Sequence, residues 1–157
     1  TVNNIDYPKK PTHVAISKKE QWRKLIQKLK KVGINAVYVQ VRPSADALYA
    51  SSFVPFSHYL TGRQGRSPEP FYDPMQHMIE IAHEYGMEFH AWLNPYRATT
   101  NLDTLNLSLW HVFNNHREWL VKYDNKFYIN LIIKYFFIYI CTDRFELFIY
   151  SNLINLI

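Results

Sequence analysis

Apolar residues recur at helical spacing across the first predicted element of the chain. They are Trp22, Leu25, Ile26, Leu29 and Val32. Ser17 and Glu20 have the spacing of a capping box, and Gly33 is the residue type that often follows a helix in the left-handed conformation. The pattern predicts a helix that begins at Ser17 and ends at Gly33.

Two further runs have the character of strands. Residues 34–41 form a β-branched, mostly apolar run that Arg42-Pro43 ends, which is typical of a strand covered on both faces. Residues 87–94 form the second run, and Pro95 closes it. We expect both runs to belong to one sheet.

The segment between these strands divides into a loop and a helix. Residues 44–72 are rich in proline and glycine and are predicted to form a long loop with short turns. Long ordered loops in compact domains are usually functional. Asp73-Pro74 then supplies the N-cap and the first residue of a second helix, which continues to Gly86.

Helices and strands therefore alternate, which predicts an α/β fold with a parallel sheet and right-handed crossovers. The segments that lead into the strands are short, whereas those that leave the strands are long. The elaborated side of the sheet is thus the carboxyl end of its strands, where barrel and open-sheet enzymes both keep their sites.

The region after the second strand is predicted to contain one more helix and a brief extended stretch. The helix is expected over residues 109–122, with Ser108 as its cap, and residues 127–130 form the extended stretch. The apolar side of this helix is expected to carry Trp110, Phe113 and Leu120.

The final segment differs in composition from the rest of the chain. Residues 131–157 contain no Gly, Ala, Val or Pro and consist largely of residue types that AT-rich codons encode. We therefore divide the chain into residues 1–130, a partial domain, and residues 131–157, a divergent apolar tail. A frameshifted or read-through sequence explains the tail, and a pair of buried strands is the alternative.

Length and composition narrow the class of protein. A chain of 157 residues can bury one ordinary core, but an eight-unit (β/α) barrel needs about 250 residues, so a barrel in this chain is incomplete. Aromatic residues make up 17% of the chain. This share suits carbohydrate sites, where ring faces receive sugar C–H groups, although core packing is the simpler explanation for most of these rings.

The net charge of +5 comes largely from a lysine-rich stretch on the first predicted helix. A solvated helix face explains this charge better than a nucleic-acid partner, because no nucleic-acid motif lies beside it. The single cysteine, Cys141, excludes an internal disulfide. The uncharged apolar runs are too short for a membrane span. No signal-peptide pattern is visible at the N-terminus, although a chain that begins without Met leaves export open.

Several ordered motifs point to one family. They are residues 4–8 (NIDYP), 35–43 (NAVYVQVRP), 46–49 (DALY), 59–62 (YLTG) and 90–97 (HAWLNPYR). Together they resemble the glycosyl-hydrolase-10-like family, whose members are mostly bacterial cell-envelope proteins. The similarity covers about residues 1–130. Tyr7 and Arg117 stand where the family has Trp and Pro.

The resemblance implies a (β/α)8 barrel of the TIM type that acts on glycans in the cell envelope or outside the cell, with peptidoglycan strands as a known substrate class. Thr1-Val2 correspond to the last residues of the family's first strand, and its later strand with paired aspartates has no counterpart after Asn130. Hydrolysis of glycosides generally uses two carboxyl groups. We therefore expect a truncated, inactive fragment in which the catalytic acids are not identified.

Candidate substrate-binding residues lie at the predicted strand ends. They are Gln40, Arg42, Asp46, His90, Trp92, Asn94, Tyr96 and Arg97. The three on the second strand alternate, so they share one side of the sheet. Asn94 and Arg97 can donate to sugar hydroxyls or to an acidic substituent, and Arg42 can bind a carboxylate. Either Trp92 or Tyr96 can stack on a pyranose ring.

Structural roles are the alternatives for these residues. Arg42 can pair internally with Asp46, and His90 can be a hydrogen-bonded core histidine. His77 and His83 lie six residues apart, on different faces of a helix, so they are not expected to bind a metal, and no cofactor is expected.

Three functions remain open from the sequence. The first is a glycoside hydrolase that takes a glycan or oligosaccharide as substrate. The second is a carbohydrate-binding protein without catalysis, which the missing acid pair favours. The third, a basic nucleic-acid-binding module, rests only on the net charge of +5 and is the weakest of the three.

Overall fold

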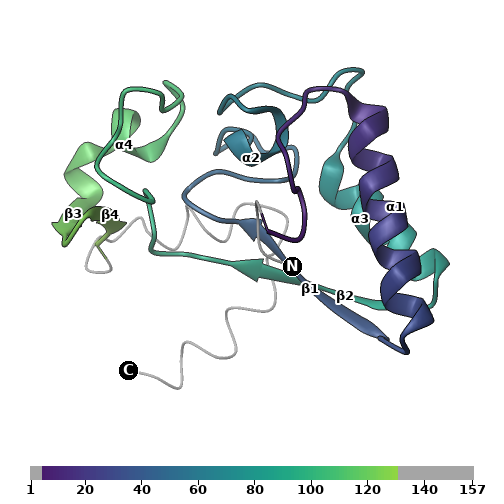
Figure 1. Cartoon of the computed structure of the whole chain (residues 1–157). Helices are drawn as coiled ribbons and strands as arrows, with labels where there is room; N and C mark the ends of the chain where they lie inside the picture. The colour runs from purple at the N-terminus through teal and green to yellow at the C-terminus, as the bar shows by residue number, and fades with distance from the viewer. Residues whose placement is uncertain (1–4, 131–157) are drawn as a thin grey trace.

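The computed structural model describes residues 5–130 as a mixed α/β arrangement without a closed barrel. Two strands, β1 (Ala36–Arg42) and β2 (Glu88–Leu93), form a parallel sheet. Two helices, α1 (Ala15–Lys31) and α3 (Pro74–Glu84), lie on one side of this sheet (Figure 1). The predicted parallel α/β organisation is confirmed. The predicted apolar tail lies outside the described residues.

The core lies between the sheet and the two helices. Val37, Val39 and Val41 alternate along β1 and are buried, as are Trp22 of α1 and Met78 of α3. The Trp22 indole Nε1 donates to the Met78 carbonyl at 3.1 Å, which joins the helices by a buried hydrogen bond. Strand pairing runs from Ala36 opposite Glu88 to Arg42 opposite Leu93, with one irregularity after Gln40.

The two helices end in the same way, and this sets where the strands begin. After α1, the Gly33 amide donates to the Lys30 carbonyl and the Ile34 amide to the Leu29 carbonyl, which is the Schellman pattern. Gly33 has a positive φ of 85°, which glycine adopts without strain. Ile34 is thus used to close the helix, and β1 begins at Ala36 rather than at residue 34.

The start of α1 corrects the predicted capping box. The helix begins at Ala15, two residues before Ser17, and its N-cap residue Val14 makes no side-chain cap. The Ala15 amide instead donates to the Glu69 carbonyl at 2.9 Å, in a backbone bridge that sequence spacing does not reveal. The Ser17 hydroxyl accepts from the Gln21 side chain within the helix. By contrast, the Asp73 carboxylate caps α3 as predicted, accepting from the amides of Met75 and Gln76.

The long loop after β1 crosses the carboxyl ends of the strands. It contains one helical turn, α2 (His58–Thr61), and a bridge that pairs Ala47 with Phe56. The Leu60 carbonyl accepts from the Thr12 amide at 3.0 Å, which fastens the loop to the chain before α1. The segment is a loop with a short helical turn, as predicted, and backbone pairing that the sequence did not reveal fastens it in place.

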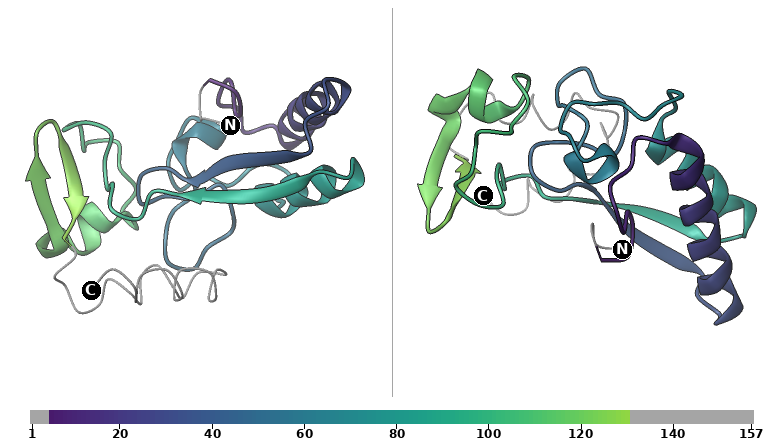
Figure 2. Two further views of the ribbon diagram at one scale, coloured as in Figure 1. Left: turned by 90° about the horizontal axis from the view of Figure 1, so that it is seen from below. Right: turned by 45° about the horizontal axis from the view of Figure 1, so that its top comes forward.

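The helix predicted over residues 109–122 is wrong. Only α4 (Val112–Asn115) and a 3-10 turn, η1 (Arg117–Trp119), are helical, and residues from Leu120 onward form a hairpin of β3 (Leu120–Tyr123) and β4 (Lys126–Ile129). The hairpin also pairs with the segment after β2, because the Ile129 amide donates to the Tyr96 carbonyl at 2.7 Å. Figure 2 shows this hairpin beside the end of the sheet that is remote from α1. The predicted extended stretch at 127–130 agrees with β4.

Within residues 5–130, none of the helices has the length and apolar character that crossing a bilayer requires.

Candidate functional site

The carboxyl ends of β1 and β2 bring two predicted site residues onto one backbone carbonyl. The Asn94 amide nitrogen Nδ2 donates to the Pro43 carbonyl at 3.1 Å, and the Arg97 Nε donates to the same oxygen at 2.9 Å. The backbone of Asn94 also donates to the Arg42 carbonyl at 3.0 Å. Because parallel strands end at the same edge of a sheet, residues 51 and 54 positions apart in the chain meet here.

Asp46 organises the turn that follows β1. Its side chain is buried, and Oδ1 accepts from the Ser44 amide at 3.3 Å while Oδ2 accepts from the Gln64 side chain at 3.0 Å. The His58 Nδ1 lies 3.9 Å from Oδ2. Both carboxylate oxygens therefore have partners inside the protein, an arrangement suited to holding the loop in place.

Gln64 extends this contact to a second loop. Its amide oxygen accepts from the Ser108 backbone amide at 2.9 Å. Gln64 is itself buried, so the chain of contacts from Asp46 through Gln64 to Ser108 runs beneath the surface. Gly65 then lies so close to Ser108 that a Cβ at this glycine would stand 2.9 Å from the serine hydroxyl. The loop after β1 and the loop before α4 are thus held against one another.

His111 fixes the other side of the same loop. It is fully buried, and its Nδ1 accepts from the Phe113 amide at 3.2 Å, so the proton of a neutral ring resides on Nε2. Nε2 then donates to the Ser44 carbonyl at 3.0 Å. Burial lowers the pKa of His111 and so favours the neutral ring. The Ser44 carbonyl and the Asp46 charge act in the opposite direction but are outweighed.

Trp92 and Gln40 lie opposite each other on the two strands. The Trp92 indole Nε1 donates to the Asn94 side-chain oxygen at 3.1 Å, and its ring is 41% exposed, whereas Gln40 is buried. Trp92 and Asn94 are therefore on one side of the sheet, as their alternation predicts. Tyr96, partly buried, packs against the core.

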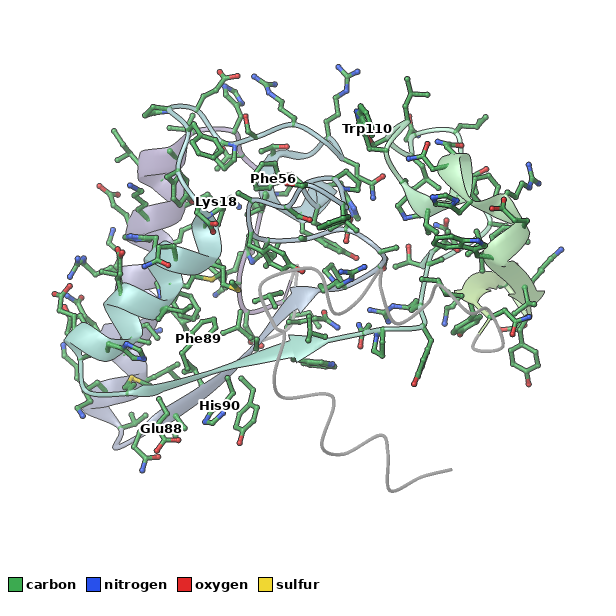
Figure 3. The ribbon with its side chains drawn as sticks, turned by 180° about the vertical axis from the view of Figure 1, so that it is seen from behind. Lys18, Phe56, Glu88, Phe89, His90 and Trp110 are labelled. Carbon is green, nitrogen blue, oxygen red and sulfur yellow. The ribbon has the colours of Figure 1, made fainter. Side chains whose placement is uncertain are left out.

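His90 lies apart from this group. Its ring stacks on Tyr38 with centroids 4.6 Å apart, and its Nε2 lies 3.0 Å from the Glu88 carboxylate. Figure 3 shows His90 beside Glu88 near the beginning of β2, well away from Trp110 on the loop side. The structure thus brings Arg42, Asn94 and Arg97 together and leaves His90 near the opposite end of the strand.

Three residues that the sequence did not single out belong to the strand-end region. They are Gln64, Tyr59 and His111. Tyr59 lies within the YLTG motif, and its pKa is raised by burial and by the Asp46 charge, while the Arg97 charge acts in the opposite direction. The YLTG motif was therefore the feature of the sequence that could have identified Tyr59 as a site residue. The role of His111 was missed because the predicted helix over residues 109–122 had Ser108 as its cap. In the structure His111 itself is the N-cap residue of α4.

The described residues contain no group of three or more histidine, cysteine, aspartate or glutamate side chains placed to hold a metal ion. Arg42, although 2% exposed, ends β1 beside the Asn94 backbone. At the carboxyl ends of β1 and β2, the side chains of Asn94 and Arg97 offer hydrogen-bond donors, and Trp92 offers an exposed indole.

Sequence comparison assigns the chain to a class. The family model "Glycosyl hydrolase-like 10" matches residues 1–141, and the chain therefore belongs to the glycosyl hydrolase-like 10 family. The resemblance inferred from the motifs is thereby confirmed.

Two curated relatives carry related names. The chain is 46% identical over 129 residues to "Glycosyl hydrolase YngK" of Bacillus subtilis (strain 168), a match covering 82% of this chain and 25% of that protein. It is 33% identical over 146 residues to "Glycosyl hydrolase DigH" of Escherichia coli (strain K12), covering 83% of this chain and 33% of that protein. The chain thus spans between a quarter and a third of the length of these relatives.

Proposed function

We propose that this chain supplies the first βα units of a (β/α)8 barrel of the TIM type, in a glycoside hydrolase that cleaves bacterial polysaccharide, with peptidoglycan glycan strands as its substrate. Family membership supports the reaction class. The parallel pairing of β1 and β2, with α1 and α3 on one side, supports the barrel, because this is the repeating unit of such a fold. The proposal also places the protein in the cell envelope or outside the cell.

The observation that carries the proposal is the cluster at the carboxyl ends of the strands. Asn94 and Arg97 converge on the Pro43 carbonyl, and the exposed indole of Trp92 lies beside Asn94. One N–H group of each side chain is used in this contact, and the remaining N–H groups, held on an ordered backbone, lose little entropy when they bind sugar hydroxyls. An exposed ring face receives the C–H face of a pyranose. This is the edge at which barrel enzymes bind their substrates.

Each predicted residue then has a proposed role. Asn94 and Arg97 bind sugar hydroxyls or an acidic substituent, and Trp92 stacks on a sugar ring. Arg42 was expected to bind a carboxylate, but because it is only 2% exposed we propose that it positions the end of β1. Tyr96 and Gln40 are further substrate-binding candidates at this edge, and His90 is a candidate that lies away from it, near the beginning of β2. For Asp46 we propose a positioning role, because both of its oxygens are already engaged by Ser44 and Gln64.

The hydrolytic step needs a carboxylic acid that protonates the leaving oxygen and a carboxylate that acts as nucleophile or activates water. Asp46 is the carboxylate of the described strand-end cluster, and its buried contacts suit neither task. We therefore assign the acid pair to the part of the protein that corresponds to the unmatched length of the curated relatives. The proposal includes truncation of this chain after Asn130.

A non-catalytic carbohydrate-binding protein is the second candidate. The observation that favours it is the same one: the strand-end cluster in residues 5–130 offers donors and an aromatic ring rather than a pair of accessible carboxylates. Both candidates use the same edge of the sheet, so binding alone does not separate them.

A reducing-end assay on peptidoglycan strands freed of their stem peptides separates the two candidates. We expect a polypeptide extended to the length of the curated relatives to release new reducing ends, and the 157-residue chain to release none. Sequencing the genomic locus across the codons after Asn130 provides the extended form. Binding of the strands by the extended form without release of ends establishes the binding protein and rejects the hydrolase.

A further inference from the structure

A groove lies between the 62–66 loop and the 100–110 segment. None of the substrate-binding residues predicted from the sequence lines it. It has a volume of about 950 Å³, which is within the range of ligand sites, and is lined by residues of the 62–66 loop and of the 100–110 segment, together with His58. Gln64 belongs to its wall. Gln64 also donates to the buried Asp46, so the wall of the groove is joined to the turn that follows β1.

Trp110 is the most unusual residue of the groove. It is 74% exposed, although tryptophan is normally a buried side chain, and its neighbour Leu109 is also exposed. Figure 3 shows Trp110 between the loop region around Phe56 and the segment that carries α4. An exposed indole on the wall of a polar groove is a flat apolar surface of the kind that sugar rings stack upon.

The loop that bears Trp110 is fixed on both sides. Before it, the Ser108 amide donates to Gln64 at 2.9 Å, and the Ser108 carbonyl accepts from the Asn114 side chain at 2.9 Å. After it, buried His111 is fastened to the Ser44 carbonyl. The Trp110 amide itself donates to the Ser108 hydroxyl at 3.3 Å. The ring is thus presented on an ordered backbone, which lowers the entropic cost of binding.

The groove is also positively charged. Arg63 and Arg66 both line it and are exposed, and Arg66 lies 3.3 Å from the Glu69 carboxylate. Asp103 is the one acidic residue in the described lining, and its Oδ1 accepts from the Leu105 amide. Guanidinium groups bind carboxylates through paired, charge-assisted hydrogen bonds. Because Arg66 is paired with Glu69, Arg63 is the arginine of the lining that favours a sugar carrying a carboxylate, in the same groove as the exposed indole of Trp110.

We propose that this groove is a second subsite, which binds a carboxylate-bearing sugar unit of the glycan by stacking on Trp110 and by ion pairing with Arg63. The subsite rests on the proposed function, because it extends the same substrate-binding edge. It adds a determinant of specificity: the protein distinguishes glycans by the charge of their substituents, at a distance from the donors of Asn94 and Arg97.

The test measures binding, so that it does not depend on cleavage. The probes are peptidoglycan strands freed of stem peptides, whose muramic acid carboxylates are free, and the same strands with those carboxylates converted to amides. Calorimetry on the extended protein is expected to give about tenfold tighter binding of the charged strands. Replacing a charge-assisted hydrogen bond by a neutral one raises the dissociation constant by about this factor. Added salt is expected to reduce this difference.

Single-residue variants show which side chains cause the preference for charged strands. Arg63→Gln is expected to remove the preference for charged strands, and Trp110→Ala to weaken binding of both strands about tenfold, with Trp110→Phe keeping most of the affinity. Arg23→Gln removes the same charge from α1, where Arg23 pairs with Glu84, and is expected to change neither quantity. Circular dichroism confirms that each variant is folded.

The outcomes also separate this inference from the proposed function. A protein that cleaves the strands but binds charged and amidated forms equally, or whose Arg63→Gln and Trp110→Ala variants bind like the parent, overturns the subsite and leaves the hydrolase in place. A protein that shows the expected preference but releases no reducing ends keeps the subsite and loses the hydrolase. Failure to bind either strand overturns the subsite as well.

Discussion

Buried polar residues organise the loop-rich edge of this sheet. Asp46 is 1% exposed and His111 is fully buried, yet each polar atom of their side chains has a partner in the protein. A buried polar group that lacks such a partner costs about 1–3 kcal/mol, so these contacts restrict the loops to one arrangement. The hydrogen bond between Gln64 and Ser108 joins the loop after β1 to the loop before α4. The buried contacts of Asp46 and His111 therefore set the positions of the loops that carry the proposed substrate-binding residues.

Asn94 is the residue whose substitution best tests the strand-end cluster. Asn94→Ala in the extended protein removes a donor to the Pro43 carbonyl and an acceptor for Trp92, both at a partly exposed position. We expect kcat/KM on glycan strands to fall about tenfold or more, as loss of about 1.4 kcal/mol of binding requires. The melting temperature is expected to fall by only a few degrees. Arg42→Ala is the less informative variant, because Arg42 is buried and its removal leaves a cavity.

Asn35→Ala serves as the matched control for Asn94→Ala. Asn35 is exposed at the opposite end of β1, and only its backbone carbonyl takes part in the pairing with Glu88. Its substitution is expected to leave turnover unchanged. Unchanged turnover together with a large loss of melting temperature in Asn94→Ala would show that Asn94 has a structural role alone.

At the scale of elements, helices and strands with local signals were predictable. Apolar spacing together with Gly33 located α1, and Asp73-Pro74 located α3, because these signals act within one turn of the chain. The strand starts were displaced by two residues and one residue, since Ile34 and Met87 are used to close the preceding helices. Such displacements follow from helix-end hydrogen bonds that the apolar pattern alone does not specify.

The region after β2 was not predictable from spacing. Trp110, Phe113 and Leu120 have helical spacing, but Trp110 is exposed and Leu120 begins a hairpin strand. The deciding contacts are long-range: His111 with Ser44, and the β4 backbone with Tyr96. The same limit applies to the candidate site. The strand-end positions of Asn94 and Arg97 were predictable from the alternation of elements, whereas the Asp46–Gln64–Ser108 contacts required the folded structure.

The first turns of α1 contain a buried charge that makes stability depend on pH. Lys18 is buried and donates to the Lys10 carbonyl, and burial lowers its pKa to about 8 from an ordinary value near 10.5. Between these two values the unfolded chain binds more protons than the folded chain, so the free energy of unfolding rises with pH. Below about pH 8 the charged amine destabilises the fold, on the order of 2 kcal/mol.

We therefore expect Lys18→Met to be more stable than the parent at pH 7 and to lose this advantage between pH 8 and 10.5. Urea denaturation of the extended protein at several pH values measures the difference. Lys24→Met, at an exposed position on the same helix, controls for the general titration of lysines at high pH. A difference between parent and Lys18→Met that stays constant across this range would contradict the assignment.

At the scale of the whole molecule, the face of the sheet opposite α1 and α3 is only partly covered within residues 5–130. Val37, Val39 and Val41 pack toward α1 and α3, whereas Tyr38 is 62% exposed and Trp92 is 41% exposed on the other face. Each strand also has one edge that no other described strand pairs with. In the proposed barrel the inward face and the edges are buried when the ring closes, so the exposed part of this face around Tyr38 is where further units would pack, whereas Trp92 lies near the strand ends.

This geometry leads to the last prediction, which concerns the chain as a separate polypeptide. Exposed aromatic residues and open strand edges promote association, so we expect the 157-residue chain to be poorly soluble, or soluble with loosely packed side chains, and to bind the dye ANS. The extended polypeptide is expected to be soluble, to melt cooperatively and to bind little dye, because closing the ring covers Tyr38 and the open strand edges. Sedimentation, near-ultraviolet circular dichroism and dye fluorescence at equal concentrations compare the two forms. A monomeric 157-residue chain that melts cooperatively and releases reducing ends would show that its two-strand sheet is sufficient, and the barrel proposal would fail with it.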